Sequence, residues 1–170
     1  MEKKRNRVGI RFVFFWHPHE ENGCFSNWSK HSIQVEEKTF PTTEHYFMFH
    51  KALSMDDQTT ANRILRAKTP SEVKSLGRQV KNFNEKLWVE NREKIMFNAL
   101  LLKAKQYPLI KEKLLETCGK VIVEASPYDT VWGIGLNKES EKSNHPECWK
   151  GKNLLGKAWM KVREVLLDSV

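Results

Sequence analysis

Residues 42–53 read TTEHYFMFHKAL and come directly after a proline. We predict a helix here, because Thr42 or Thr43 can cap its first turn with a side-chain oxygen. Glu44 and Lys51 are seven residues apart, close to two helical turns, so both charges leave the same face, roughly 10 Å apart along the axis. The other side chains are mostly aromatic or apolar, which is typical of a buried helix. A buried carboxylate and a buried amine are costly unless they are paired or used, so this pair marks a candidate site.

The same pair also has a simpler explanation. Glu44 suits the positive end of the helix dipole in the first turn. Lys51 can extend its ammonium to water from the second turn onward. The stretch alone leaves both explanations open, and the choice depends on the rest of the chain.

The composition predicts one folded domain with an anionic partner. A chain of 170 residues is long enough for one domain with a core and too short for two. The formal net charge of +8 favours a phosphate-bearing small molecule or a nucleic acid. The Lys and Arg residues are spread along the chain, so the charge does not choose between these partners, and a basic surface with no special partner stays open.

The sequence suggests neither secretion nor a membrane. No apolar run approaches the roughly 20 residues that a membrane helix needs. Residues 1–7 form a basic stub, and the segment after it has no small-residue cleavage site, so we expect a strand there rather than a secretion signal. Cys24, Cys118 and Cys148 are an odd set without CxxC spacing, so we expect no disulfide framework and a cytoplasmic location.

Two short segments combine side chains that can bind metal ions: His17-Pro18-His19 and His145-Pro146-Glu147-Cys148. Neither has the spacing of a zinc-binding pair, and a proline interrupts both. We therefore interpret them as loops and expect no metal site.

The order of the sequence patterns predicts an α+β fold, mostly helical, in a single domain over residues 8–168. Apolar or alternating segments predict strands at 8–16, 32–35, 38–40 and 121–125. Helical spacing, capping residues and Gly or Pro boundaries predict helices at 42–53, 56–68, 70–77, 84–107 and 108–118, and a last one that ends at Leu167. Because the strands come first and only one comes late, we expect the helices to pack on a small, mainly antiparallel sheet.

Three loops combine polar groups with features that suit a ligand. Residues 24–29 place Ser26 and Asn27 between two aromatic side chains, as sites for bases or sugars need. Residues 126–135 place Asp129 three positions before Trp132, with glycines that let the backbone approach a ligand. Gly151 and the N-terminus of the last helix can hold a phosphate. Each loop can also be an ordinary turn whose side chains bond local backbone.

Several segments keep an order and spacing that are specific only in combination. They are Phe25-Ser26-Asn27-Trp28, Pro41 to Tyr46 with Lys51, Leu76-Gly77-Arg78, Trp88 with Arg92 and Met96, Glu124 to Asp129, Trp132 to Gly135, and Gly151 to Gly156 with Met160 and Arg163. From about Arg11 to Leu166 the chain resembles the NADAR (YbiA-like) family of small cytoplasmic N-glycosidases. One departure is Ala104 after Lys103, where the family usually has an aromatic residue.

The resemblance implies hydrolysis of an N-glycosidic bond without a cofactor. Family members act on phosphorylated ribosylamino-pyrimidine intermediates of riboflavin synthesis, and others remove ADP-ribose from guanine bases in nucleic acid. We therefore expect a phosphorylated riboside as substrate, with ADP-ribosylated DNA or RNA left open, and no membrane partner. Both substrates are anionic ribosides with an aromatic base, which suits the positive charge of the chain.

This chemistry assigns roles to the candidate residues. Breaking the bond from C1′ to nitrogen develops positive charge on the sugar, which Glu44 or Asp129 can stabilise while one of them acts as acid or base. A desolvated Lys51 can instead attack C1′ and form a Schiff base. The remaining candidates are expected to bind substrate by stacking, hydrogen bonding or phosphate contact: Phe25, Ser26, Asn27, Arg78, Trp88, Arg92, Trp132, Gly133 and Asn153.

Two other functions fit the same sequence. The first is a module that binds ADP-ribose or a related nucleotide without turnover, in which Lys51→Ala would leave affinity nearly intact. The second is a nucleic-acid-binding protein that uses the +8 charge, with affinity that falls steeply with salt and does not depend on Glu44.

Overall fold

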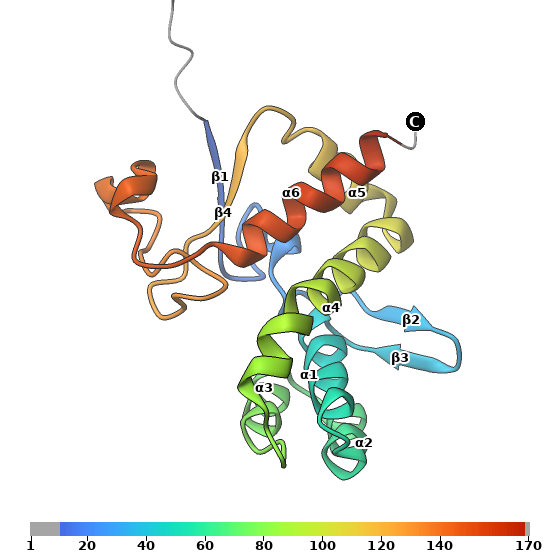
Figure 1. The fold of residues 1–170 in the computed structure, drawn as a ribbon. Helices are drawn as coiled ribbons and strands as arrows, with labels where there is room; N and C mark the ends of the chain where they lie inside the picture. The colour runs from blue at the N-terminus through green and yellow to red at the C-terminus, as the bar shows by residue number, and fades with distance from the viewer. Residues whose placement is uncertain (1–10, 169–170) are drawn as a thin grey trace, which may run out of the picture.

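The computed structural model describes residues 11–168, so the basic stub at 1–7 and the first residues of the predicted first strand lie outside the described part. The predicted α+β class is confirmed, with helices packed beside a few short strands (Figure 1). The helices are α1 Thr43–Ser54, α2 Gln58–Arg66, α3 Pro70–Arg78, α4 Glu85–Gln106, α5 Pro108–Leu115 and α6 Leu154–Leu167. The strands are β1 Phe12–Phe15, β2 Ile33–Val35, β3 Lys38–Phe40 and β4 Val121–Glu124.

The strands differ from expectation in one respect, because the described ones form two separate pairs rather than one mainly antiparallel sheet. Strands β2 and β3 pair antiparallel around a tight turn. Strands β1 and β4 pair parallel, with Phe15 opposite Glu124. Parallel strands need a long crossover, and here the connection contains the β2–β3 hairpin and helices α1 to α5. The carboxyl ends of β1 and β4 therefore meet at one edge.

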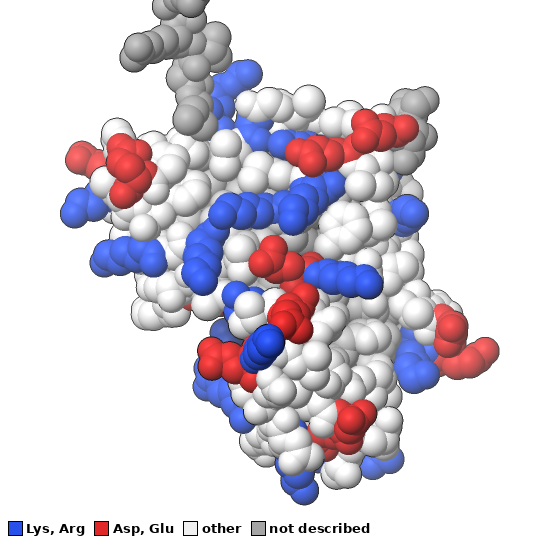
Figure 2. All heavy atoms as spheres, viewed as in Figure 1, with Lys and Arg blue, Asp and Glu red and all other residues white. Residues whose placement is uncertain are grey.

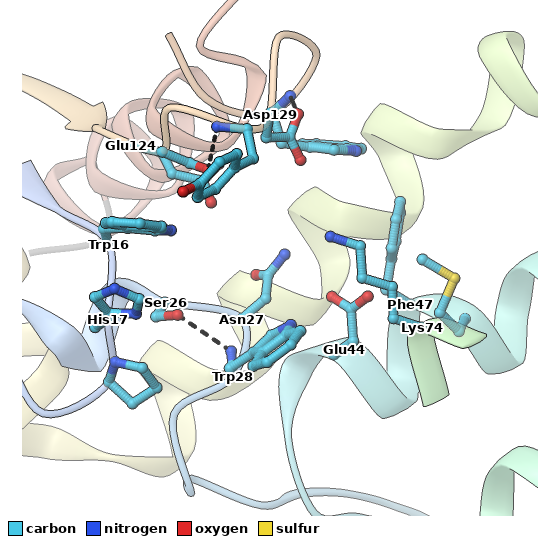
Figure 3. A pocket seen from close by; sticks show the side chains of 15 residues that line it. Trp16, His17, Ser26, Asn27, Trp28, Glu44, Phe47, Lys74, Glu124 and Asp129 are labelled. Carbon is cyan, nitrogen blue, oxygen red and sulfur yellow. Dashed lines mark hydrogen bonds between the residues drawn. The ribbon is translucent and has the colours of Figure 1, made fainter. Parts of the chain in front are cut away.

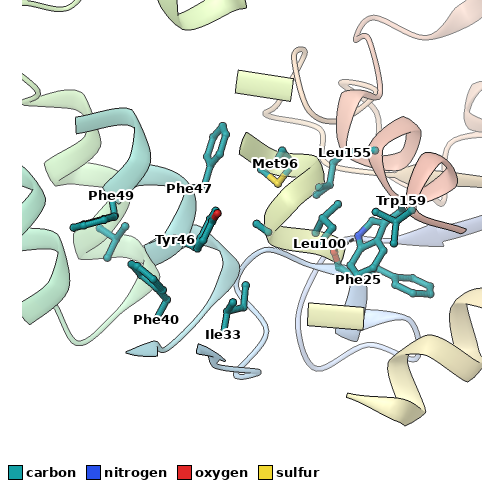
Figure 4. Close-up of a cluster of buried hydrophobic side chains, with 14 of the residues drawn as sticks. Phe25, Ile33, Phe40, Tyr46, Phe47, Phe49, Met96, Leu100, Leu155 and Trp159 are labelled. Atoms are coloured by element: carbon teal, nitrogen blue, oxygen red, sulfur yellow. Dashed lines mark hydrogen bonds between the residues drawn. The ribbon is translucent and has the colours of Figure 1, made fainter. Parts of the chain in front are cut away.

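Helix α4 joins the two halves of the molecule. On one side it contacts α1, which also contacts α2 and α3, and on the other it contacts α6, which covers β4 (Figure 1). Large buried side chains continue from Phe40, Phe47 and Phe49 near α1 to Phe25 and Trp159 near α6 (Figure 4). The apolar surface of α1 is thus used on several sides, as its composition predicts.

The helix starts agree with their capping residues. Thr42 Oγ1 accepts a hydrogen bond from the N–H of His45 at the start of α1. Thr69 does the same for Glu72 in α3, and Asn84 Oδ1 accepts from Leu87 in α4. Each side-chain oxygen satisfies a backbone donor that the helix itself leaves unpaired.

Gly77 corrects a predicted boundary, because it lies inside α3 and does not end it. A Cβ atom at this position would lie 2.3 Å from Sδ of Met48 on α1. The glycine therefore leaves room for the side chain of Met48, and its carbonyl accepts a hydrogen bond of 2.8 Å from Nζ of Lys51. The sequence signal for a helix end was a signal for close packing.

Asn153 links the start of α6 to β4, so we expect Asn153→Ala to lower the free energy of unfolding by about 3 kcal/mol. Its Oδ1 accepts from the N–H of Glu124 at 3.0 Å, and its Nδ2 donates to the carbonyl of Ile122 at 2.9 Å. Its φ of 53° is left-handed, a conformation that Asn tolerates better than Ala. Urea unfolding measures the change.

Two further variants separate the causes of that loss. Asn153→Gly accepts the left-handed backbone but lacks both hydrogen bonds, so it should remain destabilised by most of the same amount. Asn144→Ala, at an exposed position, should change the unfolding free energy by less than about 0.5 kcal/mol. A stable Asn153→Gly variant would show that the backbone angle, and not the two bonds, is what Asn153 contributes.

Candidate active site

A cavity of about 300 Å³ lies where the ends of β1 and β4, the loop after β4, the segment 26–28 and helices α1 and α3 meet. Figure 3 shows carboxylates, a lysine and aromatic rings around it. The lining residues are Trp16, His17, Pro18, Ser26, Asn27, Trp28, Glu44, Phe47, Met48, Lys74, Glu124, Ser126, Tyr128, Asp129 and Trp132. The cavity thus combines three carboxylic acids with flat aromatic surfaces.

The parallel pairing of β1 and β4 builds one side of the cavity. The ladder ends with Phe15 opposite Glu124, and the N–H of Ala125 donates to the carbonyl of Phe15 at 2.9 Å. Trp16 and Glu124 therefore reach the cavity from adjacent strand ends, although more than 100 positions separate them in the chain.

The loop after β4 presents Asp129 through a tight turn. Its Oδ1 accepts the N–H groups of Val131 at 2.9 Å and Trp132 at 2.7 Å. A Cβ atom at Gly133 would lie 2.9 Å from the carbonyl oxygen of Asp129 and 3.0 Å from that of Glu124. The absence of a side chain at Gly133 lets this turn fold back against the end of β4.

Helix α1 and the segment 26–28 form the opposite side. The N–H of Glu44, in the first turn of α1, donates to the carbonyl of Asn27 at 3.0 Å. Glu44 is 5% exposed, and Phe47 on the next turn packs edge-on against Trp132 with ring centroids 5.1 Å apart. The helix that was predicted to carry the site therefore brings its carboxylate to the cavity wall.

Burial changes the acidity of two of the three carboxyl groups. Desolvation raises the pKa of Glu44 to about 7, with a further increase from Asp129 and opposing effects from Lys74 and Lys51. Desolvation raises the pKa of Glu124 to about 8, and the charges of Asp129 and Glu44 add to it. Near neutral pH the cavity therefore holds at least one protonated carboxylic acid, that of Glu124.

The raised pKa of Glu124 predicts a stability that depends on pH. A carboxyl group whose folded-state pKa lies above its unfolded value binds more protons when folded, so its ionisation lowers stability as the pH rises from about 4.5 to about 8. Glu124→Gln removes this effect. We expect the variant to gain about 2–4 kcal/mol relative to wild type between pH 4 and pH 9. Urea unfolding at both pH values measures it, and a difference that is the same at pH 4 and pH 9 would contradict the buried-acid assignment.

Two buried polar atoms of the cavity have no hydrogen-bond partner among the described residues. They are Oε2 of Glu124 and Oδ1 of Asn27. Buried polar atoms are almost always paired, so unpaired ones in a cavity wall are groups that a ligand can satisfy. Their positions on opposite sides of the cavity suit a ligand that spans it.

Two lysines serve this region differently. Lys74 of α3 lines the cavity, and its Nζ lies 6.0 Å from the ring centroid of Trp28. Lys51 does not line it. Its Nζ donates to the carbonyl of Gly77 and lies 4.6 Å from the ring centroid of Phe83 and 5.6 Å from that of Trp88, while burial lowers its pKa.

Comparison with known proteins places this architecture in a family. The pattern of the NADAR domain matches residues 14–167. The chain belongs to the NADAR domain family. It is 36% identical over 160 residues to N-glycosidase R617 of Acanthamoeba polyphaga mimivirus, covering 94% of this chain and 90% of that one.

Other relatives extend the comparison. An N-glycosidase of Nostoc punctiforme is 36% identical over 155 residues, covering 91% of this chain and 90% of that one. The solution structure of the E. coli protein YbiA is similar with a TM-score of 0.77 at 30% identity, covering 95% of this chain and 88% of that one.

The NADAR domain brings five of the twelve residues that were singled out in the sequence to the cavity wall: Ser26, Asn27, Glu44, Asp129 and Trp132. Trp88 packs behind it against Phe47, with ring centroids 5.0 Å apart. Lys51, Arg78, Arg92 and Gly133 do not line it either, and Arg78 is exposed at the end of α3.

Two of the predicted substrate contacts are corrected. Phe25 is fully buried, and its ring packs against Phe15 and Trp159 in the core. Asn153 is 1% exposed, and its side-chain amide bonds the backbone of β4. Both side chains stabilise the elements around the cavity, and neither lines it.

Glu124 and Lys74 line the cavity but were not among the residues predicted for the site. Glu124 ends a run of apolar strand residues, and a carboxylate at the end of a buried strand was a usable signal, but the sequence did not show that β1 and β4 pair. Lys74 is one of many lysines, and nothing in its helix distinguishes it. Within residues 11–168 no group of three or more His, Cys, Asp or Glu is placed to hold a metal ion.

Proposed function

We propose that this NADAR domain is an N-glycosidase that cleaves a phosphorylated riboside in the cavity lined by Glu44, Glu124 and Asp129. The observation that carries the proposal is the shared cavity itself, in which two of three carboxyl groups have a pKa at or above neutral. Relatives with the same domain are named N-glycosidases, which supports the reaction class.

The three carboxyl groups suit the two needs of glycosidic cleavage. The leaving base needs a proton at its glycosidic nitrogen, and Glu124 is protonated at neutral pH because its pKa is about 8. The sugar develops positive charge at C1′, and an ionised Asp129 or Glu44 stabilises it. The cavity therefore separates an acid from a stabilising charge.

Lys51 is our candidate for the nucleophile. Burial lowers its pKa, which increases the fraction of neutral amine. To react, Nζ leaves the carbonyl of Gly77, turns toward the cavity and bonds to C1′. The electron pair of the broken bond goes to the base nitrogen, which takes the proton from Glu124. The bond from C1′ to the ring oxygen then breaks, and that oxygen keeps the electron pair and takes a proton from the attached nitrogen, which leaves a protonated Schiff base at C1′. Water hydrolyses the Schiff base, which releases the sugar and restores the amine.

The lining favours an aromatic base and an anionic sugar. Trp16, Trp28 and Tyr128 supply flat surfaces on which a base can stack. Lys74 is the one Lys or Arg among the described lining residues and suits a phosphate. We propose a ribosylamino-pyrimidine phosphate or an ADP-ribosylated guanine as the substrate.

The basic side chains on and just before α6 are the observation that keeps nucleic acid among the substrates. Basic side chains form a band along α6 (Figure 2), and the exposed lysines of α6 and the segment before it are Lys150, Lys152, Lys157 and Lys161. Lysines arranged along one face suit the phosphates of a strand. A guanine-linked ADP-ribose in an oligonucleotide would use this band, whereas a free pyrimidine riboside would not.

The experiment that tests the proposal measures release of free base from both substrates. If the protein releases base from the oligonucleotide at a rate that falls as salt is added, and releases little base from the pyrimidine riboside, the substrate is a nucleic acid. The opposite preference would assign the small riboside. Tight binding of ADP-ribose with no base released from either would replace the proposal with the binding module.

A further inference from the structure

Lys103 is the most completely buried Lys or Arg in the described part of the chain, and the proposed reaction does not use it. It lies on α4, its side chain is 0% exposed, and burial lowers its pKa to about 7. Its Nζ donates to the carbonyl of Ser26 at 3.1 Å and to Oγ of Ser29 at 2.5 Å. The ring centroid of Trp159 lies 5.7 Å from the same atom. A buried ammonium is costly, so its retention beside these acceptors needs a reason.

The acceptors belong to a segment that has no regular structure of its own. Three successive backbone carbonyls at the start of this segment, those of residues 25–27, accept hydrogen bonds from three different helices. The carbonyl of Phe25 accepts from Nε1 of Trp159 on α6, that of Ser26 from Lys103 on α4, and that of Asn27 from the N–H of Glu44 on α1. Buried backbone carbonyls need such partners, and the three donors together fix the path of the chain.

The path of this segment decides which of its side chains line the cavity. Ser26, Asn27 and Trp28 line it, and Oδ1 of Asn27 is buried without a partner among the described residues. Ser29 closes the segment, because its hydroxyl also donates to the carbonyl of Ser26 at 2.9 Å. Lys103 therefore hydrogen-bonds both ends of the Ser26–Ser29 segment, Ser26 and Ser29, and does not itself line the cavity.

We propose that Lys103 is a positioning residue, which holds the Ser26–Ser29 segment so that Asn27 and Trp28 face the substrate. The kinetic part of this inference rests on the proposed function, and the structural part does not. A lysine suits the role because one ammonium serves two acceptors at the end of a long side chain. Met has a similar length and no donor, so Lys103→Met removes both bonds and little volume.

The test combines hydrogen exchange with steady-state kinetics on the full chain. In Lys103→Met we expect the amides of residues 25–29 to exchange about 10- to 100-fold faster, while α2 and α5 keep their protection. We expect KM to rise about tenfold and kcat to change less than about threefold, because the carboxyl groups stay in place. Lys105→Met, at an exposed position two residues along α4, should match wild type in hydrogen exchange, KM and kcat.

A purely structural role would give a different result. Partial unfolding would lower kcat with the active fraction, leave KM unchanged and accelerate exchange throughout the chain, which would overturn the proposal. If Lys103→Met does not fold, Ser29→Ala removes one acceptor more gently. That variant should still accelerate exchange at residues 25–29 alone, and unchanged exchange there would also overturn it. The exchange result needs no substrate, so an inactive wild type would refute the proposed function and leave this inference testable.

Discussion

Glu124→Gln should lower kcat by about 10²- to 10⁴-fold, the usual contribution of a general acid, while KM changes little. The amide has nearly the shape of the protonated carboxylic acid but cannot give up a proton to the leaving base. Wild-type Glu124 has a pKa of about 8 because it is desolvated and lies near Asp129 and Glu44, so it carries that proton at neutral pH. Steady-state release of free base at pH 7 measures the change.

The matched control is an acid outside the cavity. Glu147→Gln alters an exposed carboxylate that pairs with His145 at 3.3 Å, and its kcat should equal that of wild type. Glu124→Gln also removes the cost of keeping this carboxyl group protonated in the folded state, so its unfolding free energy should not fall at neutral pH. A kcat for Glu124→Gln within threefold of wild type would exclude Glu124 as the acid.

Lys51→Ala should lower kcat/KM by more than about 10³-fold, because it removes the nucleophile of the proposed covalent route. With wild type, borohydride added during turnover should reduce the Schiff base and leave the opened sugar attached at Lys51. Peptide mass analysis locates the modified lysine. The variant should show neither turnover nor attachment.

Lys74→Ala is the matched control for that experiment. Lys74 lines the cavity and is proposed to contact phosphate, so its loss should raise KM and leave the attachment at Lys51 intact. Attachment at Lys74 would show that the lysine already facing the cavity is the nucleophile. Turnover with no attachment would transfer the chemistry to water activated by a carboxylate.

Much of the fold could be predicted from local signals. Thr42, Thr69 and Asn84 begin helices as their side chains predict, and the hairpin of β2 and β3 follows from alternation around a short polar turn. The pairing of β1 with β4 could not be predicted, because it depends on how the five helices that separate these strands in the sequence pack together. Gly77 was misinterpreted for the same reason, since only the approach of Met48 explains it.

The residues of the cavity likewise fall into those that local sequence signals indicate and those that only the packing of distant segments brings to it. Glu44 and Asp129, which line the cavity, could be singled out because a carboxylate among apolar side chains, or before a Trp-Gly step, is unusual within its own segment. Glu124 reaches the cavity only through the parallel strand pairing, and Lys74 only through the approach of α3. Phe25 and Asn153 lie in segments that do approach the cavity, but their side chains turn to the core and to β4.

The most direct test of the central claim compares wild type with Glu44→Gln and Glu124→Gln on an ADP-ribosyl-guanine oligonucleotide and a phosphorylated ribosylamino-pyrimidine. Free base and freed sugar are quantified together, and binding of each substrate is measured separately. We predict that wild type releases base and sugar in equal amounts from at least one substrate, and that both variants bind it but release little. Equal release by all three proteins, or binding without release by wild type, would contradict an N-glycosidase that works through these buried carboxyl groups.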